Sequence, residues 1–242
     1  MSSEDRHLWP SFLEEALLDS ARFCLEIEED RRLCELCDFL FFKDQKLQFH
    51  SAELGLMAFD FESLWHYHQK QNYALSKEPL ARALGIKGNS TQTIWDTTCG
   101  TGKDSLLISF FGARLKSFER HPAIYLLLQD ALRRFPTNFD LVFADASQLT
   151  LLANERPDII YYDPMYPDKS GSKKSALPRK EMRIFKEVVG DDLDSDTFLE
   201  WALQTAKERV VVKRSLQAGE LKSKPSASYK GKSTRYDMYK IF

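Results

Sequence analysis

Residues 92–112 of the chain read QTIWDTTCGTGKDSLLISFFG. QTIWD is typical of a short strand, and SLLISFFG is typical of a helix. The loop between them carries Gly100 and Gly102, and glycine lets the backbone approach a ligand closely because it has no Cβ. This strand, loop and helix predict the first unit of an α/β sheet with a ligand beyond its edge.

Strands and helices alternate from this unit toward the C-terminus. Segments typical of strands are RLKSFER (114–120), FDLVFAD (139–145), DIIYYD (158–163) and RVVVKR (209–214), and those typical of helices are PAIYLLLQDALRRF (122–135) and DTFLEWALQTAK (196–207). Such alternation indicates an α/β fold with a doubly wound, mostly parallel sheet. Residues 228–242 predict two strands joined by a turn, so we expect an antiparallel hairpin at the sheet edge.

The chain before this sheet is organised differently. Residues 11–42 begin with apolar side chains at helical spacing, and residues 46–61 read as short strands with a turn at Gly55. The polar segment KGNSTQ then predicts a boundary near residue 90. We expect a small α+β extension (1–90) with a role in substrate binding, followed by the main domain (91–242).

One further helix is expected just before that boundary, in SKEPLARALGIKGNS. Ser76 has the side chain of a helix N-cap, and Gly85 suits the C-terminal stop.

The composition is that of a soluble globular protein, with 242 residues, 43% hydrophobic and 29% charged. No apolar run approaches the ~20 residues needed to span a bilayer, and the N-terminus lacks the pattern of a signal peptide. Four cysteines are too few for a disulfide framework, so a cytoplasmic location is expected. Cys34 and Cys37 form one isolated CxxC, which favours two helix-face thiols over a metal or redox site. No metal is expected.

The net charge of −2 hides an uneven distribution. Residues 1–40 hold eleven acidic and four basic side chains, whereas residues 169–186 hold seven basic side chains and one acidic. Residues 207–240 hold ten basic and three acidic. This asymmetry suits an anionic partner. The alternative is a solvated, lysine-rich surface that binds nothing.

Four successive predicted strands end in a carboxylate. These are Asp96, Glu119, Asp145 and Asp163. A single acid at a strand end is usually a turn former or a helix cap. Because ligands of open α/β sheets bind beyond the carboxyl ends of the strands, four acids at that edge indicate a ligand site.

The glycine loop does not match a phosphate-binding motif. A dinucleotide fingerprint requires a third glycine where this chain has Ser105, and Asp104, directly after Lys103, would repel a phosphate. Glu119, nineteen residues after Gly100, is placed to accept hydrogen bonds from both hydroxyls of a ribose. These features fit an adenosine cofactor without phosphates, and S-adenosylmethionine is the natural candidate. Asp145 is placed to accept from the adenine amino group, with Ser147 and Gln148 nearby.

The fourth strand ends in IIYYDPMYP, residues 159–167. The Asp163 carboxylate and the Pro164 carbonyl can each accept a hydrogen bond from a base amine, which would aim its lone pair at a methyl sulfonium. Tyr166 could stack on that base. Pro164 and Pro167 restrict the corner, so the acceptors are held in place in advance. The alternative is that Asp163 caps a turn and Tyr166 is a half-buried aromatic.

The stretches IWDTTCGTGKDSLLISFFGARLKSFERHPAIYLLLQDAL, YYDPMYPDKSGSKKSALPRKEMRIFKEVVGDDLD and RVVVKR resemble the RsmJ family of S-adenosylmethionine-dependent methyltransferases, over roughly residues 85–240. The resemblance implies a Rossmann-like class I methyltransferase fold and methylation of the exocyclic N2 of a guanine in small-subunit (16S) ribosomal RNA. It also implies cofactor contacts at Lys103, Asp104, Glu119, Arg120, Ser147, Gln148 and Asp163.

The sequence departs from that family in two places. The family's first loop typically reads Asp-Ala-Thr-Ala-Gly-Leu-Gly-Arg-Asp, so Cys99, Thr101 and Lys103 differ, and Cys99 adds a thiol near the expected sulfonium. The family also carries a basic, glycine-rich segment where this chain has HYHQKQNYALSKEP, residues 66–79.

The expected reaction is direct methyl transfer from the sulfonium to a base nitrogen, with ribosomal RNA or the small ribosomal subunit as the partner. Basic residues expected to hold RNA phosphates are Lys169, Lys173, Lys174, Arg179, Lys180, Lys213 and Arg214. Two alternatives stay open: an N-methyltransferase acting on another nucleic acid, such as DNA adenine or cytosine, and a non-catalytic RNA-binding module. Ser105 disfavours a nicotinamide dehydrogenase.

Overall fold

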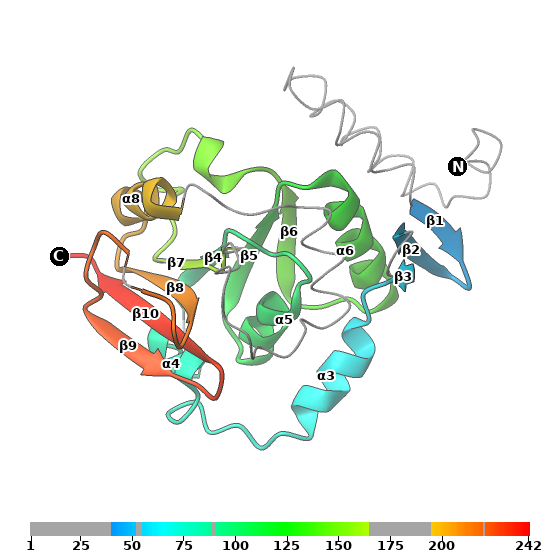
Figure 1. The fold of residues 1–242 in the computed structure, drawn as a ribbon, viewed down its shortest axis with the longest axis horizontal. Coiled ribbons are helices and arrows are strands. Elements are labelled where there is room, and N and C mark those ends of the chain that lie inside the picture. Colours follow the sequence, from blue (N-terminus) through cyan, green and yellow to red (C-terminus); the bar gives the residue numbers. More distant parts are fainter. Residues whose placement is uncertain (1–39, 52–54, 89–90, 165–194, 220) are drawn as a thin grey trace. The chain divides into compact units, whose positions relative to one another are not determined.

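The computed structural model describes residues 40–51, 55–88, 91–164, 195–219 and 221–242 (Figure 1). The chain forms two compact units, and it passes back and forth between them. One unit contains residues 1–61, 120–136 and 165–191, and the other contains residues 62–119, 137–164 and 192–242. The boundary near residue 90 stays a prediction.

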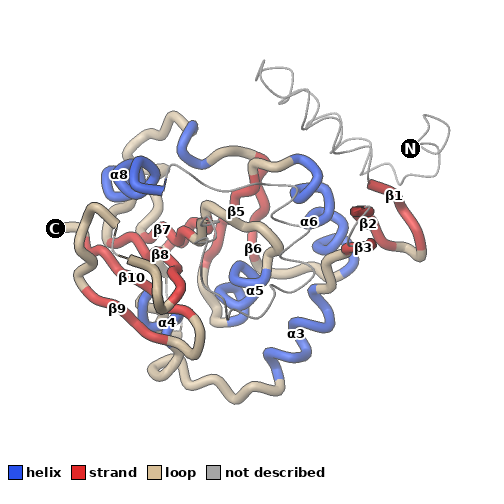
Figure 2. The backbone as a smooth tube through the Cα atoms, in the orientation of Figure 1, coloured by secondary structure: helices blue, strands red, loops and turns tan. Residues whose placement is uncertain are grey.

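The larger unit is built on a seven-stranded sheet in the order β6-β5-β4-β7-β8-β10-β9 (Figure 2). Its strands are β4 (Thr93–Asp96), β5 (Arg114–Glu119), β6 (Phe139–Phe143), β7 (Ile159–Tyr162), β8 (Arg209–Ser215), β9 (Ala227–Lys230) and β10 (Thr234–Lys240). Strands β4 to β8 are parallel, whereas β10 is antiparallel to both β8 and β9. The predicted doubly wound sheet and terminal hairpin are therefore confirmed.

Helices pack on both faces of this sheet, because successive strand residues point to opposite faces. Helix α8 (Ser195–Thr205) supplies Leu199 and Ala202 to a buried cluster. The sheet residues of that cluster include Trp95, Phe118, Ile160, Tyr162, Val210 and Val212. Helices α5 (Lys103–Phe110) and α4 (Pro79–Leu84) serve the opposite face, where the Tyr161 hydroxyl reaches Asp104 of α5 and Arg209 reaches the carbonyl of Ala83 in α4. No helix in the described part of the chain is long and apolar enough to cross a bilayer.

Helix α4 begins later than the sequence predicts. Its N-cap is Glu78 and Pro79 occupies the first turn, so Ser76 lies in the preceding turn and is not the cap. Proline suits that position because its φ is already helical and no N–H partner is needed there. Gly85 ends the helix in the left-handed region at φ 74°, as predicted.

Helix α3 (Phe61–Gln69) begins where the sequence predicts strands to end. Phe61, Leu64 and His68 repeat at helical spacing, and both Phe61 and His68 are buried. The pattern is hidden in the sequence because the third member is a histidine, which counts as polar although its ring packs like an apolar group.

The smaller unit joins a three-stranded antiparallel sheet to helix α6 (Pro122–Arg134). The strands are β1 (Leu40–Lys43), β2 (Lys46–Ser51) and β3 (Gly55–Met57). Asp130 of α6 is fully buried, and its carboxylate accepts hydrogen bonds from the N–H of Leu47 at 3.0 Å and from Arg134 at 2.8 Å. Arg134 also donates to the carbonyl of Phe59 at 2.6 Å. One buried carboxylate thus ties α6 to the middle strand.

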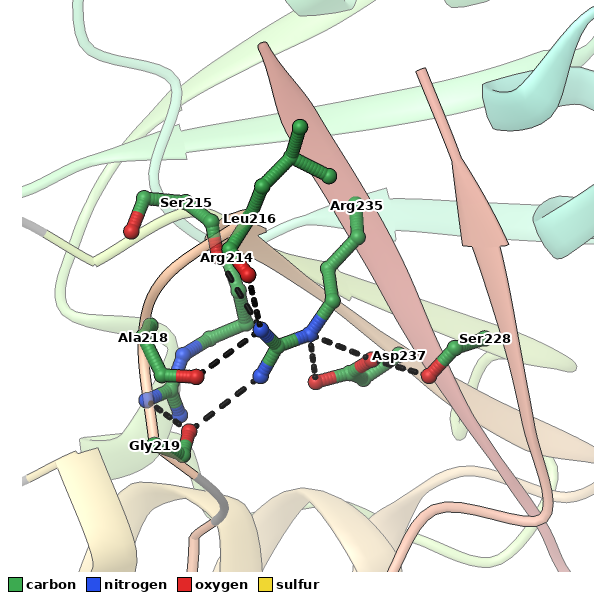
Figure 3. A network of polar contacts seen from close by, with 8 residues as sticks. All are labelled: Arg214, Ser215, Leu216, Ala218, Gly219, Ser228, Arg235 and Asp237. Atoms are coloured by element: carbon green, nitrogen blue, oxygen red, sulfur yellow. Dashed lines mark hydrogen bonds and ion pairs between the residues drawn. The ribbon is translucent and has the colours of Figure 1, made fainter. Parts of the chain in front are cut away.

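Arg235 of β10 fixes the C-terminal strands to the loop that follows β8 (Figure 3). Its Nε donates to both oxygens of Asp237 at 3.0 Å, and Asp237, which is 2% exposed, also accepts from Ser228 of β9. The remaining guanidinium nitrogens donate to the carbonyls of Ser215, Leu216, Ala218 and Gly219. One side chain therefore satisfies a buried acid and a loop together.

Arg235→Met should lower the free energy of unfolding by about 3 kcal/mol, because it leaves the Asp237 carboxylate buried without its charged partner. Urea unfolding measures this loss. The double variant Arg235→Met, Asp237→Leu removes both charges and should recover part of it. A single variant as stable as the unchanged chain would contradict the prediction.

Candidate active site

The candidate site lies where β4 and β7 meet, the point at which the strand order reverses and open α/β sheets bind ligands. Thr97 donates to the carbonyl of Tyr161 through its N–H at 3.0 Å and its hydroxyl at 2.9 Å. The N–H of Asp163 donates to the hydroxyl of Thr98 at 2.7 Å. These bonds hold the glycine loop after β4 and the proline corner after β7 side by side.

The glycine loop folds back onto the end of β5. Gly100 and Gly102 have φ angles of 57° and 73°, which residues with a Cβ rarely adopt. The N–H of Gly100 donates to the Glu119 carboxylate at 2.9 Å, and the N–H of Cys99 donates to the carbonyl of Phe118, also at 2.9 Å. Glu119, predicted to bind a ribose, therefore also anchors the loop.

Cys99 lies buried within this loop, with its Sγ 3.5 Å from the Ser105 hydroxyl. Burial, and next the charge of Asp96, raise the pKa of the thiol well above its ordinary value.

Asp96 lies beneath the loop, with only 1% of its surface exposed. Its carboxylate accepts from the Ser105 hydroxyl at 2.5 Å and from the N–H of Thr98 at 3.1 Å. Burial raises the pKa of Asp96 to about 7, although both donors lower it. Of the predicted cofactor contacts, Asp96 is thus the one that supports the loop from inside. Ser105, which replaces the third glycine of a dinucleotide site, supplies that support.

Lys213 of β8 lies between two acids at this edge. Its Nζ is 2.7 Å from Asp104 Oδ2 and 2.9 Å from Asp163 Oδ2, and the Tyr161 hydroxyl donates to the same Asp104 oxygen at 2.6 Å. Burial opposes ionisation of Asp104, but the charge of Lys213 and the hydrogen bonds from Lys213 and Tyr161 outweigh it, so the pKa of this carboxyl lies below its ordinary value. Burial likewise lowers the pKa of Lys213, but the two carboxylates outweigh it and hold that pKa well above 10.5.

The sequence analysis missed Tyr161 as part of the site, although a signal for it exists. Alternate strand residues share a face, so the second residue before Asp163 belongs on the same side of the sheet. Its hydroxyl contact with Asp104 confirms that placement.

Lys213 and Arg214 do not line one RNA-facing surface, as the sequence analysis expects. They are adjacent on β8, so their side chains point to opposite faces. Lys213 contacts the two acids, whereas Arg214 is 6% exposed and donates to the carbonyl of Gly219 at 2.9 Å (Figure 3). The prediction of a shared face is wrong. Tyr166 and the other predicted RNA contacts, Lys169, Lys173, Lys174, Arg179 and Lys180, lie outside the described residues.

The remaining predicted contacts lie at neighbouring strand ends. Asp145 caps a short 3₁₀ helix, Ala146–Gln148, and accepts from the N–H and the hydroxyl of Ser147 at 2.9 and 2.7 Å. Gln148 is exposed. Lys103 is exposed at the start of α5, next to Asp104, and Arg120 is exposed directly after β5.

The segment HYHQKQNY forms the end of α3 and the turn after it. His68 Nδ1 lies 2.7 Å from the Tyr73 hydroxyl, and the Tyr73 ring packs against Phe110 and Phe111, with centroids 6.0 and 5.4 Å away. A pocket of about 290 Å³ is lined by His68, Gln69, Gln71, Asn72, Tyr73, Leu75, Phe110 and Phe111. Burial lowers the pKa of His68, while the charge of Asp104 opposes this, so the segment is electrostatically linked to the acid cluster.

Known proteins similar to this chain include methyltransferases. A family model for S-adenosylmethionine-dependent methyltransferases matches residues 23–241. The chain is 38% identical to ribosomal RNA small subunit methyltransferase J of Haemophilus influenzae, over 81% of the chain and 80% of that protein. It is 41% identical to the protein of the same name from Thioalkalivibrio sulfidiphilus, over 71% of each. The solved structure of a SAM-dependent methyltransferase from Neisseria gonorrhoeae matches with a TM-score of 0.63 and 31% identity, over 84% of this chain and 82% of that one.

The raised pKa of Asp96 predicts a pH-dependent stability. A carboxyl whose pKa rises from 3.8 to about 7 on folding destabilises the fold progressively as the pH rises between those values. Asp96→Asn does not titrate, so between pH 4 and pH 8 its stability relative to the unchanged chain should rise by up to about 4 kcal/mol. Urea unfolding at both pH values tests this, with Asp140→Asn, at an exposed position of β6, as the control. The same pH dependence in both variants would count against it.

Proposed function

Because the chain belongs to the ribosomal RNA small subunit methyltransferase J family, we propose that it transfers a methyl group from S-adenosylmethionine to the exocyclic N2 of a guanine in 16S ribosomal RNA. The observation that carries the chemistry is the bond between the N–H of Asp163 and the hydroxyl of Thr98. This bond joins the corner suited to an amine to the loop suited to the methyl donor.

The residues present fit S-adenosylmethionine. The positive φ angles of Gly100 and Gly102 keep the loop free of side chains, so its backbone can approach a ligand. The acids Asp104, Glu119 and Asp163 outnumber the one cation they surround, and a carboxylate-rich site favours a ligand with a sulfonium and an ammonium group. When bound, this cofactor supplies an electrophilic methyl group.

We assign the cofactor contacts by position along the sheet edge. Glu119 would hold the ribose hydroxyls, and the turn containing Asp145, Ser147 and Gln148 would hold the adenine. Lys103 and Asp104 follow the glycine loop directly, and Arg120 follows Glu119 in sequence. This assignment combines the family resemblance with the order of the strands β4, β5 and β6.

At the proline corner, Asp163 and the carbonyl of Pro164 would accept hydrogen bonds from the guanine amino group. This amine is neutral, so positioning contributes more than removal of a proton before attack. Pro164 is buried and fixes the backbone directly after Asp163. Tyr166 would stack on the base, which has to leave any helical stack to reach the corner.

The proposal is tested with small subunits or 16S ribosomal RNA from cells that lack this protein. Incubation with S-adenosylmethionine should add one N2-methylguanine, located by mass spectrometry. A methyl group on adenine or cytosine would overturn the guanine assignment. No binding of S-adenosylmethionine in calorimetry would leave only the non-catalytic RNA-binding alternative.

Asp163→Ala should lower kcat by at least about 100-fold, because the amine loses the acceptor that orients it. Radiolabelled methyl transfer measures the rate, and thermal melting checks that the fold is kept. Asp140→Ala, at an exposed strand position, is the matched control and should keep full activity. Unchanged turnover in Asp163→Ala would remove this residue from the mechanism.

Charge reversal at Lys173 and Lys174 should weaken RNA binding and make it less dependent on salt, because fewer counterions are released from the phosphates. The slope of log K against log salt should become shallower by about 1.5–2. Filter binding over a salt series measures it. Lys230→Glu with Lys232→Glu, exposed near the terminal hairpin turn, is the control of equal charge. Equal losses in both pairs would mean that the 169–186 run has no specific role.

A further inference from the structure

We propose that Lys213 is a positioning residue for methyl transfer, one that fixes the Asp163 carboxylate beside Asp104 and keeps both acids ionised. The inference rests on the proposed function of Asp163 as the acceptor for the target amine. It replaces the phosphate contact that the sequence suggests for Lys213.

The geometry places Lys213 between the two halves of the site. Asp104 lies in the first turn of α5, directly after the glycine loop, whereas Asp163 lies at the proline corner after β7. The Lys213 ammonium contacts both, at 2.7 and 2.9 Å, from a third element, β8. Two carboxylates in one site repel each other, so a cation between them lets both remain charged and sets the distance between them.

The groups around Lys213 leave it little freedom. Its side chain is 23% exposed, and Tyr236 of β10 is its direct partner across the antiparallel pair. Tyr161 donates to the Asp104 oxygen that Lys213 also contacts. A lysine held in this way has a defined position, unlike an exposed lysine that follows a phosphate backbone.

The other titratable groups of the cluster do not replace the charge of Lys213 at neutral pH. Burial, and then Asp104, raise the pKa of Tyr236 to about 12, and burial also raises that of Tyr161. Burial lowers the pKa of His68, which Asp104 raises. Asp96 adds a further acid on which the charges of Asp104 and Asp163 act. Lys213 is the cation of this group.

A fixed cation makes Asp163 a weaker base but a defined acceptor. The amine therefore keeps its protons while it attacks: nitrogen gains a bond to the methyl carbon, and the carbon–sulfur bond breaks with its electron pair on sulfur. The methylated nitrogen then carries an extra proton, which passes to Asp163 or to water. In this arrangement Lys213 contributes by fixing charge and direction, and it makes no contact with the reacting atoms.

The test compares Lys213→Met and Lys213→Arg in methyl transfer to ribosomal RNA between pH 5 and pH 9. Lys213→Met should lower kcat at pH 7 by about 100-fold, with a much smaller change in KM for S-adenosylmethionine. It should also move the acidic limb of the kcat profile up by one pH unit or more, because the acids protonate more easily without the cation. Lys213→Arg keeps the charge and should recover most of both changes.

Two controls separate this role from a purely structural one. Lys230→Met makes the same substitution at an exposed position of β9 and should change neither kcat nor the profile. Lys213→Met, Asp104→Asn removes one charge of each sign, so it should fold where Lys213→Met melts early, and its kcat should still be low. An unmoved acidic limb in Lys213→Met, or equal impairment of the methionine and arginine variants, would overturn the proposal.

Carbon-13 NMR titration of the aspartate carboxyls gives a readout that needs no activity. The pKa of Asp104 should rise in Lys213→Met relative to the unchanged chain and should stay low in Lys213→Arg. If the unchanged protein transfers no methyl group to ribosomal RNA, the proposed function fails. The NMR titration still decides whether Lys213 holds the acids ionised.

Discussion

The hydrogen bonds from Thr97 and Thr98 to the end of β7 are the constraint on which the rest of the site depends. They use the backbone carbonyl of Tyr161 and the N–H of Asp163, so they fix the course of the chain at the corner and do not rely on long, adaptable side chains. Two loops from strands far apart in the sequence thereby become one rigid surface. Preorganisation of this kind is what a transfer reaction between two bound molecules requires.

Electrostatics then assigns different work to similar acids. Asp96 is buried beneath the loop with a raised pKa, whereas Asp104 keeps a low pKa because Lys213 and Tyr161 compensate for its burial. Glu119 divides its carboxylate between the loop and the edge of the sheet. The sequence shows all of these as acids at or just after strand ends, and only their neighbours distinguish support from ligand contact.

The parallel sheet and its edge follow from patterns that the sequence carries openly, such as the apolar runs and the acid at the end of each. The face on which a side chain lies is also readable, since Lys213 and Arg214 have to diverge on one strand. What the sequence hides are contacts between distant elements: Ser105 beneath Asp96, Tyr161 on Asp104, and Lys213 between two acids. Helix α3 was obscured for another reason, because a histidine completes its apolar face.

Cys99 gives the loop a chemical property of its own. A thiolate beside a methyl donor would be a target for self-alkylation, and the enzyme would inactivate itself during turnover. Burial and the surrounding acids keep this sulfur protonated, and the protonated thiol is a poor nucleophile. The same negative environment that suits a sulfonium ligand therefore protects the cysteine from it. A sequence can thus carry a thiol at this position without becoming a substrate of its own reaction.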